Sequence, residues 1–255
     1  MEQTIVGIDI GHGSVKIVSD GLLSVEEVGC MVSFPTVITP ARETHFSITK
    51  KSATPIEVGQ YKYWVGEDAR ESTNFLNTKY ERCFLDDIYL AFYKKALSYV
   101  APGPIHVVTG LPVSEHAKWH HELKKRLTGE FKVNGNVYEV LSVRVMPQPF
   151  GSFFHYILDS NGHLMNEDVL EESVGIIDIG NRTTDFILGE SGEWVAKGAS
   201  GTINIGVSNL LENIANHVSE TYEVDLSTVK VQKALRDRQI TVYGKTTDIG
   251  KIVDK

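Results

Sequence analysis

One segment of the chain occurs twice. Residues 6–18 have the sequence VGIDIGHGSVKIV and residues 175–187 have the sequence GIIDIGNRTTDFI, so a shift of 169 positions places Asp9 on Asp178. Each copy is an aliphatic run ending in Asp-Ile-Gly, then small or polar residues, a hydroxyl residue and a second aliphatic run. The pattern predicts a β-hairpin in each copy, with an aspartate, backbone amides and a hydroxyl at its tip. A duplication of this kind favours a fold built from two related lobes.

Strand and helix patterns alternate between and after the two copies, which predicts an α/β architecture. Ser114 is the expected N-cap of a helix, and Asn134-Gly135 predicts a hairpin turn. The polar stretch 159–172 is the expected surface connection between a first lobe, 1–158, and a second lobe, 159–255. Strands are expected over residues 26–38, 55–65, 105–109 and 140–145, and helices over 84–99, 114–127, 148–158, 206–219 and 229–238.

The charge balance and the cysteine content exclude several classes of protein. The chain has 25 basic and 33 acidic residues, a net charge of −8, which argues against direct nucleic-acid binding through a broad basic surface. No apolar run approaches the ~18–20 residues of a membrane span, and no signal segment begins the chain, so we expect a cytoplasmic protein with no membrane partner. Cys30 and Cys83 offer no disulfide framework and no paired metal-ligand spacing, and are expected to be small buried or semi-buried side chains.

The two predicted hairpin tips have the chemistry of a nucleotide site. Glycines let backbone N–H groups approach phosphate oxygens, hydroxyls add donors, and two carboxylates can hold a hydrated Mg²⁺. A single Asp-x-Gly is usually an ordinary β-turn. Two copies at matching positions between aliphatic strands favour the phosphate-binding interpretation for both.

Five segments carry a resemblance to the actin-like ATPase superfamily. Residues 9–16, DIGHGSVK, and 178–185, DIGNRTTD, resemble its two phosphate loops, and PQPFG at 147–151 resembles the start of its first connecting helix. VTGLP at 108–112 and GASGTINIG at 198–206 are similar to the ParM-like branch. The resemblance implies an actin-like, ribonuclease H-like duplicated fold with two lobes around a nucleotide cleft.

The resemblance also implies roles for individual residues. Asp9 and Asp178 would hold Mg²⁺ through its water ligands, Asp178 would polarise the attacking water, and Gln148 would orient that water. A neutral amide cannot accept a proton, so we expect slow hydrolysis; the alternative for Gln148 is a solvent-exposed position at a helix start. The groups expected to contact nucleotide belong to Gly11, His12, Gly13, Ser14, Lys16, Gly180, Asn181, Thr183, Thr184, Gly201 and Thr202.

The function implied by the resemblance is that of a filament-forming, Mg²⁺-dependent ATPase, with GTP as a possible nucleotide. In the ParM-like branch such filaments segregate plasmid DNA, and a separate adaptor protein makes the DNA contact. Two alternatives stay open: a small-molecule kinase of the sugar-kinase branch, and a non-polymerising, chaperone-like regulatory ATPase. The kinase would need a carboxylate base aimed at an acceptor hydroxyl, for which the sequence offers no clear candidate.

Several residues have two interpretations on the sequence alone. Asp185 extends the second site or satisfies local backbone amides, and His12 lies beside the γ-phosphate or caps its turn. Lys230 and Lys233 contact the ribose and base, as the resemblance implies, or belong to a solvated helix face.

The histidines and aromatic residues of two predicted helices have ordinary explanations. His116 and His120 stand at i and i+4, a spacing that can bind Zn²⁺, but no third ligand is evident and a solvated helix face is expected. Phe153, Phe154 and Tyr156 fit core packing, although an exposed subset would suit a subunit contact.

The region after the second repeat is short for an actin-like lobe. Relatives close this lobe with a further helix, a strand and a Gly-Gly turn that grips the adenosine, and these 255 residues contain no Gly-Gly dipeptide. We therefore expect the second lobe, 159–255, to be incomplete at its carboxyl end, and nucleotide binding to be weak or absent in the chain as given.

Overall fold

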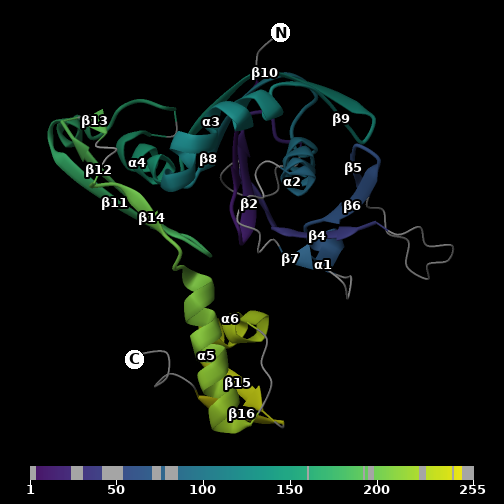
Figure 1. Ribbon diagram of the computed structural model, residues 1–255, viewed down its shortest axis with the longest axis vertical. Coiled ribbons are helices and arrows are strands. Elements are labelled where there is room, and N and C mark those ends of the chain that lie inside the picture. The colour runs from purple at the N-terminus through teal and green to yellow at the C-terminus, as the bar shows by residue number, and fades with distance from the viewer. Residues whose placement is uncertain are drawn as a thin grey trace. The chain divides into compact units, whose positions relative to one another are not determined.

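The computed structural model divides the chain into two compact units (Figure 1). The first unit comprises Met1–Asp178 and Asp185–Thr202, and the second comprises Ile179–Thr184 and Ile203–Lys255. Cys30 and Cys83 lie outside the residues that the structure describes. Those residues are 4–23, 31–41, 54–70, 76–77, 86–159, 161–191, 193–194, 198–223, 228–242 and 244–248.

A six-stranded sheet forms the centre of the first unit, in the order β3-β2-β1-β8-β10-β9. Its strands are β1 (Thr4–Ile10), β2 (Ser14–Ser19), β3 (Met31–Pro35), β8 (Gly103–Leu111), β9 (Gly129–Val133) and β10 (Asn136–Pro147). β1 and β2 form the hairpin expected from the first repeat, while β1, β8 and β10 are parallel to one another. The carboxyl ends of these three strands therefore meet at one edge of the sheet, where α/β proteins commonly bind ligands.

Two helices cover one face of this sheet, α2 (Asp87–Leu97) and α3 (Val113–Leu127). The strands alternate, so that Val6, Ile8 and Ile17 point into the core. Burial of each such side chain stabilises the fold by about 1.5–3 kcal/mol. The Asp86 carboxylate accepts a hydrogen bond from Tyr89 N at 3.0 Å, which starts α2 at the next residue.

Tight turns explain the hairpins of the first unit. Asn134 and Gly135 have φ of 51° and 83° and join β9 to β10, as the Asn-Gly dipeptide predicts. The single strand expected over 55–65 is wrong, because Gly59, with φ of 58°, turns the chain into a hairpin. A small sheet results, with β4 (Val37–Pro40), β5 (Ile56–Val58), β6 (Tyr61–Val65) and β7 (Leu76–Asn77), followed along the chain from β6 by α1 (Glu67–Arg70).

A further sheet contains the two strands of the second repeat. Its strands are β11 (Ser173–Ile179), β12 (Thr184–Glu190), β13 (Glu193–Trp194) and β14 (Gly201–Ile203), and it follows α4 (Pro149–Ile157) and a 3₁₀ helix, η2 (Glu167–Glu171). Phe150 of α4 stacks on Trp194 of β13 with ring centroids 4.6 Å apart. This contact packs α4 against this sheet.

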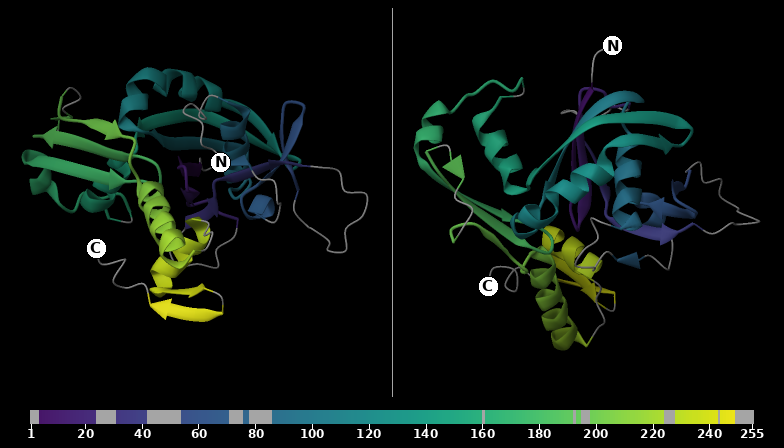
Figure 2. Two further views of the ribbon diagram at one scale, coloured as in Figure 1. Left: turned by 60° about the horizontal axis from the view of Figure 1, so that its bottom comes forward. Right: turned by 45° about the horizontal axis from the view of Figure 1, so that its top comes forward.

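The second unit contains two helices and a hairpin (Figure 2). Leu211 and Ala215 of α5 (Val207–Tyr222) pack against Val231 of α6 (Thr228–Asp237). The strands β15 (Gln239–Val242) and β16 (Lys245–Asp248) then pair antiparallel. No helix among the described residues has the length and apolar character needed to cross a membrane.

Candidate functional site

The two repeated hairpin tips are closed by the same hydrogen bond. Gly11 N donates to Ser14 O at 3.1 Å, and Gly180 N donates to Thr183 O at 2.8 Å. A Cβ on either glycine would lie 3.2 or 3.1 Å from that carbonyl oxygen, so a larger residue would strain both turns. The duplication in the sequence is therefore also a duplication of turn geometry.

A buried threonine anchors the first tip, and the sequence analysis missed it. Thr36 Oγ1 donates to Gly11 O at 2.6 Å, and Thr36 N donates to Gly13 O at 3.3 Å. The residue follows directly after β3, which pairs with β2. Its only sequence signal is a hydroxyl residue between two strands, which is too common to identify an anchor.

The amino end of α5 holds the second tip. Val207 N donates to Gly180 O at 3.1 Å, and Ser208 N donates to Asn181 O at 2.8 Å. The first amides of the helix thus find their acceptors in the carbonyls of the repeated turn. Because both partners belong to the second unit, this tip and α5 form one local structure.

Gly206 and Thr184 complete this local structure. A Cβ on Gly206 would lie 2.7 Å from backbone atoms of Asn181 and Arg182, closer than real Cβ contacts. Thr184 Oγ1 donates to Ile205 O at 2.7 Å, so this hydroxyl, which was expected to contact nucleotide, supports the turn in the structure.

Three of the expected site residues meet at the carboxyl end of β1. Gln148 Nε2 donates to Asp9 Oδ1 at 3.0 Å, and Lys16 Nζ lies 3.4 Å from Asp9 Oδ2. The side chains of Lys16 and Asp9 are 54% and 41% exposed, so a ligand can reach both. Gln148 does not point away into solvent, which was the alternative interpretation of this residue.

Strand β8 determines where Gln148 lies. Gln148 N donates to Leu111 O at 2.9 Å, and a Cβ on Gly110 would lie 2.8 Å from Gln148 Cγ. The Gly-Leu-Pro segment at the end of β8 therefore leaves room for the glutamine and binds its backbone.

The Asp178 carboxyl has a raised pKa. Its pKa is raised above its usual value by burial and then by the negative charges of Asp185 and Asp9, while Lys16 opposes the shift. A carboxylate of raised pKa is a better proton acceptor, and a nearby cation would relieve the repulsion.

The donor set fits a hydrated ion. Among the described residues, no three His, Cys, Asp or Glu side chains are grouped closely enough to ligate a metal directly. Mg²⁺ usually keeps several water ligands and needs only one or two carboxylates. Asp9 and Asp178 supply that number.

Asp185 and Thr202 cap the amino end of α3. Asp185 Oδ1 accepts from Val113 N at 2.7 Å and from Thr202 Oγ1 at 2.5 Å, and Thr202 Oγ1 accepts from Ser114 N at 3.0 Å. Ser114 is therefore not the N-cap that the sequence predicted. Pro112 occupies that position without a side-chain bond, and the acceptors come from β12 and β14.

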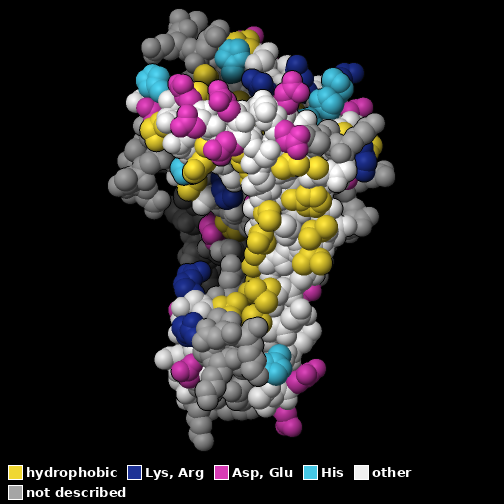
Figure 3. Space-filling view, turned by 90° about the vertical axis from the view of Figure 1, so that its left-hand side faces the viewer, with side chains coloured by type: hydrophobic (Ala, Val, Ile, Leu, Met, Phe, Trp, Pro, Cys, Tyr) yellow, Lys and Arg dark blue, Asp and Glu magenta, His cyan; other side chains and the backbone are white. Residues whose placement is uncertain are grey.

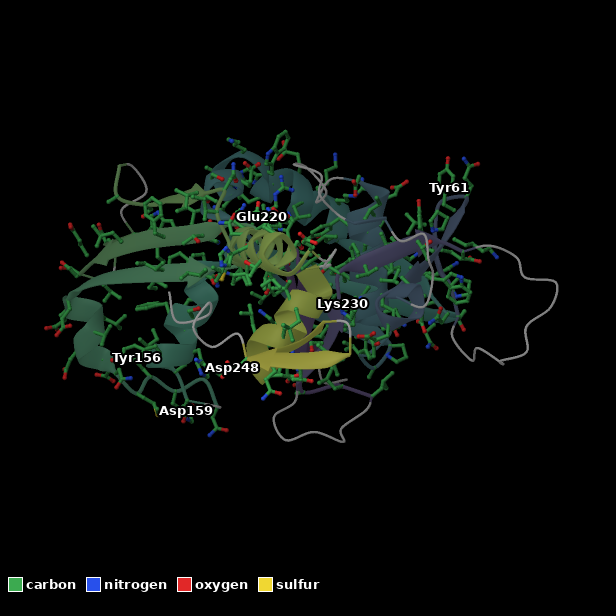
Figure 4. All side chains as sticks on the ribbon, turned by 90° about the horizontal axis from the view of Figure 1, so that it is seen from below. Tyr61, Tyr156, Asp159, Glu220, Lys230 and Asp248 are labelled. Atoms are coloured by element: carbon green, nitrogen blue, oxygen red, sulfur yellow. The ribbon has the colours of Figure 1, made fainter. Side chains whose placement is uncertain are left out.

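The remaining expected residues have structural partners or lie in solvent. A Cβ on Gly201 would lie 3.0 Å from the Phe186 ring, so this glycine admits an aromatic side chain. His12 is half-buried, and Lys230 is exposed on α6 (Figure 4). The Lys233 side chain lies outside the described part of the structure.

The histidine pair of α3 has backbone partners. The His116 and His120 rings stack with centroids 4.7 Å apart. Nε2 of His116 lies 3.1 Å from Val145 O, and Nδ1 of His120 lies 2.7 Å from His116 O. Both side chains are half-buried, so this part of the helix is less exposed to solvent than the sequence predicted.

Comparison with protein families gives two matches. The family of actin-like proteins, N-terminal domain, matches residues 7–151. The C-terminal family of the archaeal actin homologue, MreB-like, matches residues 176–255. No curated protein sequence matches the chain.

Solved structures share the fold at low sequence identity. A ParM from Clostridium botulinum, solved as a 15-stranded filament, is 21% identical with a TM-score of 0.71 over 100% of this chain and 80% of its own. An archaeal actin homolog is 18% identical with a TM-score of 0.75 over 98% and 76%. The same homolog solved in complex with ADP is 17% identical, with a TM-score of 0.72 over 98% and 76%. The first of the two family matches covers more than half of the residues of this chain. The chain therefore belongs to the actin-like proteins.

Proposed function

We propose that the protein binds ATP with Mg²⁺, assembles into actin-like filaments and hydrolyses the nucleotide slowly to control filament turnover. The observation that carries the proposal is the meeting of Asp9, Gln148 and Lys16 at the end of β1, with Asp178 close enough for its pKa to respond to the charges of Asp9 and Lys16. An archaeal actin homolog of the same fold binds ADP, which supports an adenine nucleotide.

Each repeated tip carries groups that are proposed to bind nucleotide phosphates. Lys16 supplies a point charge for the β- and γ-phosphate oxygens. Asp9 and Asp178 would hold Mg²⁺ through its water ligands, and the ion would supply positive charge to offset that of the phosphates. The backbone amides and hydroxyls proposed to donate to the phosphates belong to Gly11, Gly13, Ser14, Gly180, Asn181 and Thr183.

The attacking water would be oriented by Gln148 and polarised by Asp178. Since Nε2 of Gln148 donates to Asp9, Oε1 is the atom of this amide that remains to accept a hydrogen bond from water. The raised pKa of Asp178 makes its carboxylate a better acceptor for the second proton of the attacking water. An amide cannot itself become the base, so slow turnover is expected.

Filament formation is supported by fold and by surface. A ParM of the same fold forms filaments. Strand β11 exposes Ile177 and Ile179 by 71% and 64%, and Tyr156 of α4 is 60% exposed. Figure 3 shows hydrophobic side chains at the surface of one face, and Figure 4 shows where Tyr156 lies. Exposed apolar side chains of this size are typical of association surfaces. By analogy with ParM, we propose plasmid segregation in the cytoplasm, with DNA bound by a separate adaptor.

Sedimentation and light scattering test the proposal directly. ATP with Mg²⁺ should convert the protein to a pelletable polymer, and phosphate release should follow and return it to the supernatant. ADP, and ATP with a chelator, are the controls. The same assay with GTP in place of ATP shows which nucleotide the protein prefers. ATP hydrolysis without any change in sedimentation across a wide protein concentration range would contradict filament formation and favour a regulatory ATPase. Turnover stimulated by one compound in a panel of sugars and acids would favour a kinase.

A further inference from the structure

The amino end of α3 is capped from a distant part of the chain. The helix begins at Val113, and its own N-cap, Pro112, makes no side-chain hydrogen bond. The first two amides are instead bound by Asp185 Oδ1 at 2.7 Å and by Thr202 Oγ1 at 3.0 Å. We call this group of four residues, Val113, Ser114, Asp185 and Thr202, the α3 clamp.

The clamp has a defined hydrogen-bond direction. Thr202 Oγ1 donates to Asp185 Oδ1 and accepts from Ser114 N, so the hydroxyl is used as donor and acceptor at once. Asp185 is 3% exposed, and its negative charge lies at the positive end of the helix. A charge-assisted bond of this kind is stronger than a neutral one and resists competition by water.

The clamp joins α3, which packs on the six-stranded sheet, to the sheet of β12 and β14 at the proposed hydrolytic site. Asp185 belongs to β12, which pairs with β11, the strand that contains Asp178. On the other side, Pro112, the N-cap of α3, follows Leu111, whose carbonyl oxygen accepts from Gln148 N. One short path of bonds therefore connects the strand of Asp178 to the backbone of Gln148.

We propose that Asp185 and Thr202 are positioning residues, which set the placement of Gln148 relative to Asp178 by fixing the amino end of α3 against the sheet of β12 and β14. This inference rests on the proposed ATP hydrolysis. Neither residue needs to touch the nucleotide, so Thr202 serves the site through the clamp in place of the direct nucleotide contact expected from the sequence. Displacement of a reacting group by about 1 Å can cost roughly 100-fold in rate with little effect on binding.

A pair of threonine variants tests the proposal. Thr202→Val keeps the shape and removes the hydroxyl, while Thr202→Ser keeps the hydroxyl. We expect Thr202→Val to lower kcat for ATP hydrolysis about 10- to 100-fold with the dissociation constant for ATP changed less than about 2-fold. Thr202→Ser should restore kcat. Thr246→Val in the β15–β16 hairpin, which removes a hydroxyl contact of 3.2 Å to Thr241, is the matched control and should hydrolyse as wild type.

Hydrogen exchange gives a readout that does not depend on turnover. The amides of Val113 and Ser114 should exchange slowly in wild type and faster in Thr202→Val. Asp185→Asn retains an acceptor oxygen but no charge, and should fall between wild type and Thr202→Val in both exchange and kcat.

The two possible failures are distinguishable. Suppose that wild type and Thr202→Val hydrolyse ATP equally well, while the Val113 and Ser114 amides exchange faster in the variant. The clamp is then only structural, and the positioning role is overturned while the proposed ATP hydrolysis stands. Equal losses in kcat and ATP affinity would also overturn it. If wild type hydrolyses no ATP, the proposed function fails and the positioning role fails with it.

Discussion

The side-chain amide of Gln148 donates to Oδ1 of Asp9 at 3.0 Å, although 139 residues separate the two in the chain. They meet because β1, β8 and β10 are parallel and end at the same edge of the six-stranded sheet. The bond also leaves Oε1 as the atom of the amide that can accept a hydrogen bond from water. This one contact therefore decides both the position and the orientation of the Gln148 side chain.

Replacement of Gln148 by alanine should remove the water-orienting group. We expect Gln148→Ala to lower kcat for ATP hydrolysis by about 10²–10⁴-fold, with ATP binding nearly unchanged, because the amide acts on the water rather than on the phosphates. Phosphate release under single-turnover conditions is the measurement. Gln239→Ala, an exposed glutamine on β15, is the control. Wild-type turnover in Gln148→Ala would remove this residue from the proposed mechanism.

Asp178 should be required for hydrolysis more than for binding. We expect Asp178→Ala to abolish phosphate release while nucleotide affinity stays largely intact, since the residue polarises water and holds the ion only through its water ligands. Asp168→Ala, an exposed carboxylate on η2, is the matched control. Unchanged turnover in Asp178→Ala would show that another carboxylate is the important one.

Gly110 should tolerate no side chain, because it lies against Gln148. The added methyl of Gly110→Ala would lie 2.8 Å from Gln148 Cγ. We expect a loss of about 1–3 kcal/mol in the free energy of unfolding, and a lower kcat because Gln148 must shift. Gly151→Ala is the control, since a Cβ there meets nothing within 4 Å on helix α4, and should stabilise by about 0.5–1 kcal/mol. Chemical denaturation measures both.

Gly206 should be equally intolerant for a different reason. A Cβ would lie 2.7 Å from backbone atoms of Asn181 and Arg182, which cannot rotate away as a side chain can. We expect Gly206→Ala to destabilise by about 1–3 kcal/mol and to weaken nucleotide binding by distorting the second tip. Gly175→Ala on β11, where a Cβ meets nothing within 4 Å, should be close to neutral. Equal stability of the two variants would argue against the contact between this tip and α5.

Protonation of His116 should lower the free energy of unfolding in mild acid. Burial lowers its pKa below 6.5, its bond to Val145 O acts in the opposite direction, and the neighbouring His120 lowers it further. The unfolded chain therefore binds the proton more readily, so the stabilising contribution is present above about pH 6.5 and is lost as the pH falls through the folded-state pKa. Each unit of pKa difference is worth about 1.4 kcal/mol. Denaturation at pH 7.5 and 5.5 should show a smaller loss of unfolding free energy for His116→Gln than for wild type, and an equal loss in the two proteins would contradict this role of His116.

Local chemistry made much of the fold predictable. Asn134-Gly135 adopts the positive φ values that its hairpin needs, and the repeated Asp-Ile-Gly turns both close with an amide-to-carbonyl bond three residues on. These features depend on neighbours in sequence, and so the residue pattern is sufficient to predict them.

Contacts between distant segments were not predictable in the same way. Ser114 looked like an N-cap because a hydroxyl residue precedes a helical pattern, but α3 takes its cap from Asp185, 72 residues away. Thr36 anchors Gly11 across 25 residues without any pattern of its own. An acceptor can come from any strand that the sheet order brings near.

The sequence alone therefore determined the duplicated hairpin tips, the alternation of strands and helices, and the resemblance to actin-like proteins. Only the tertiary structure decided that Gln148 bonds to Asp9, that Asp185 and Thr202 belong to the α3 clamp, and that Gly110 and Gly206 have no room for a side chain. The physical reason is that backbone turns are governed by residues in succession, whereas a site is governed by which strand ends lie at the same edge of a sheet.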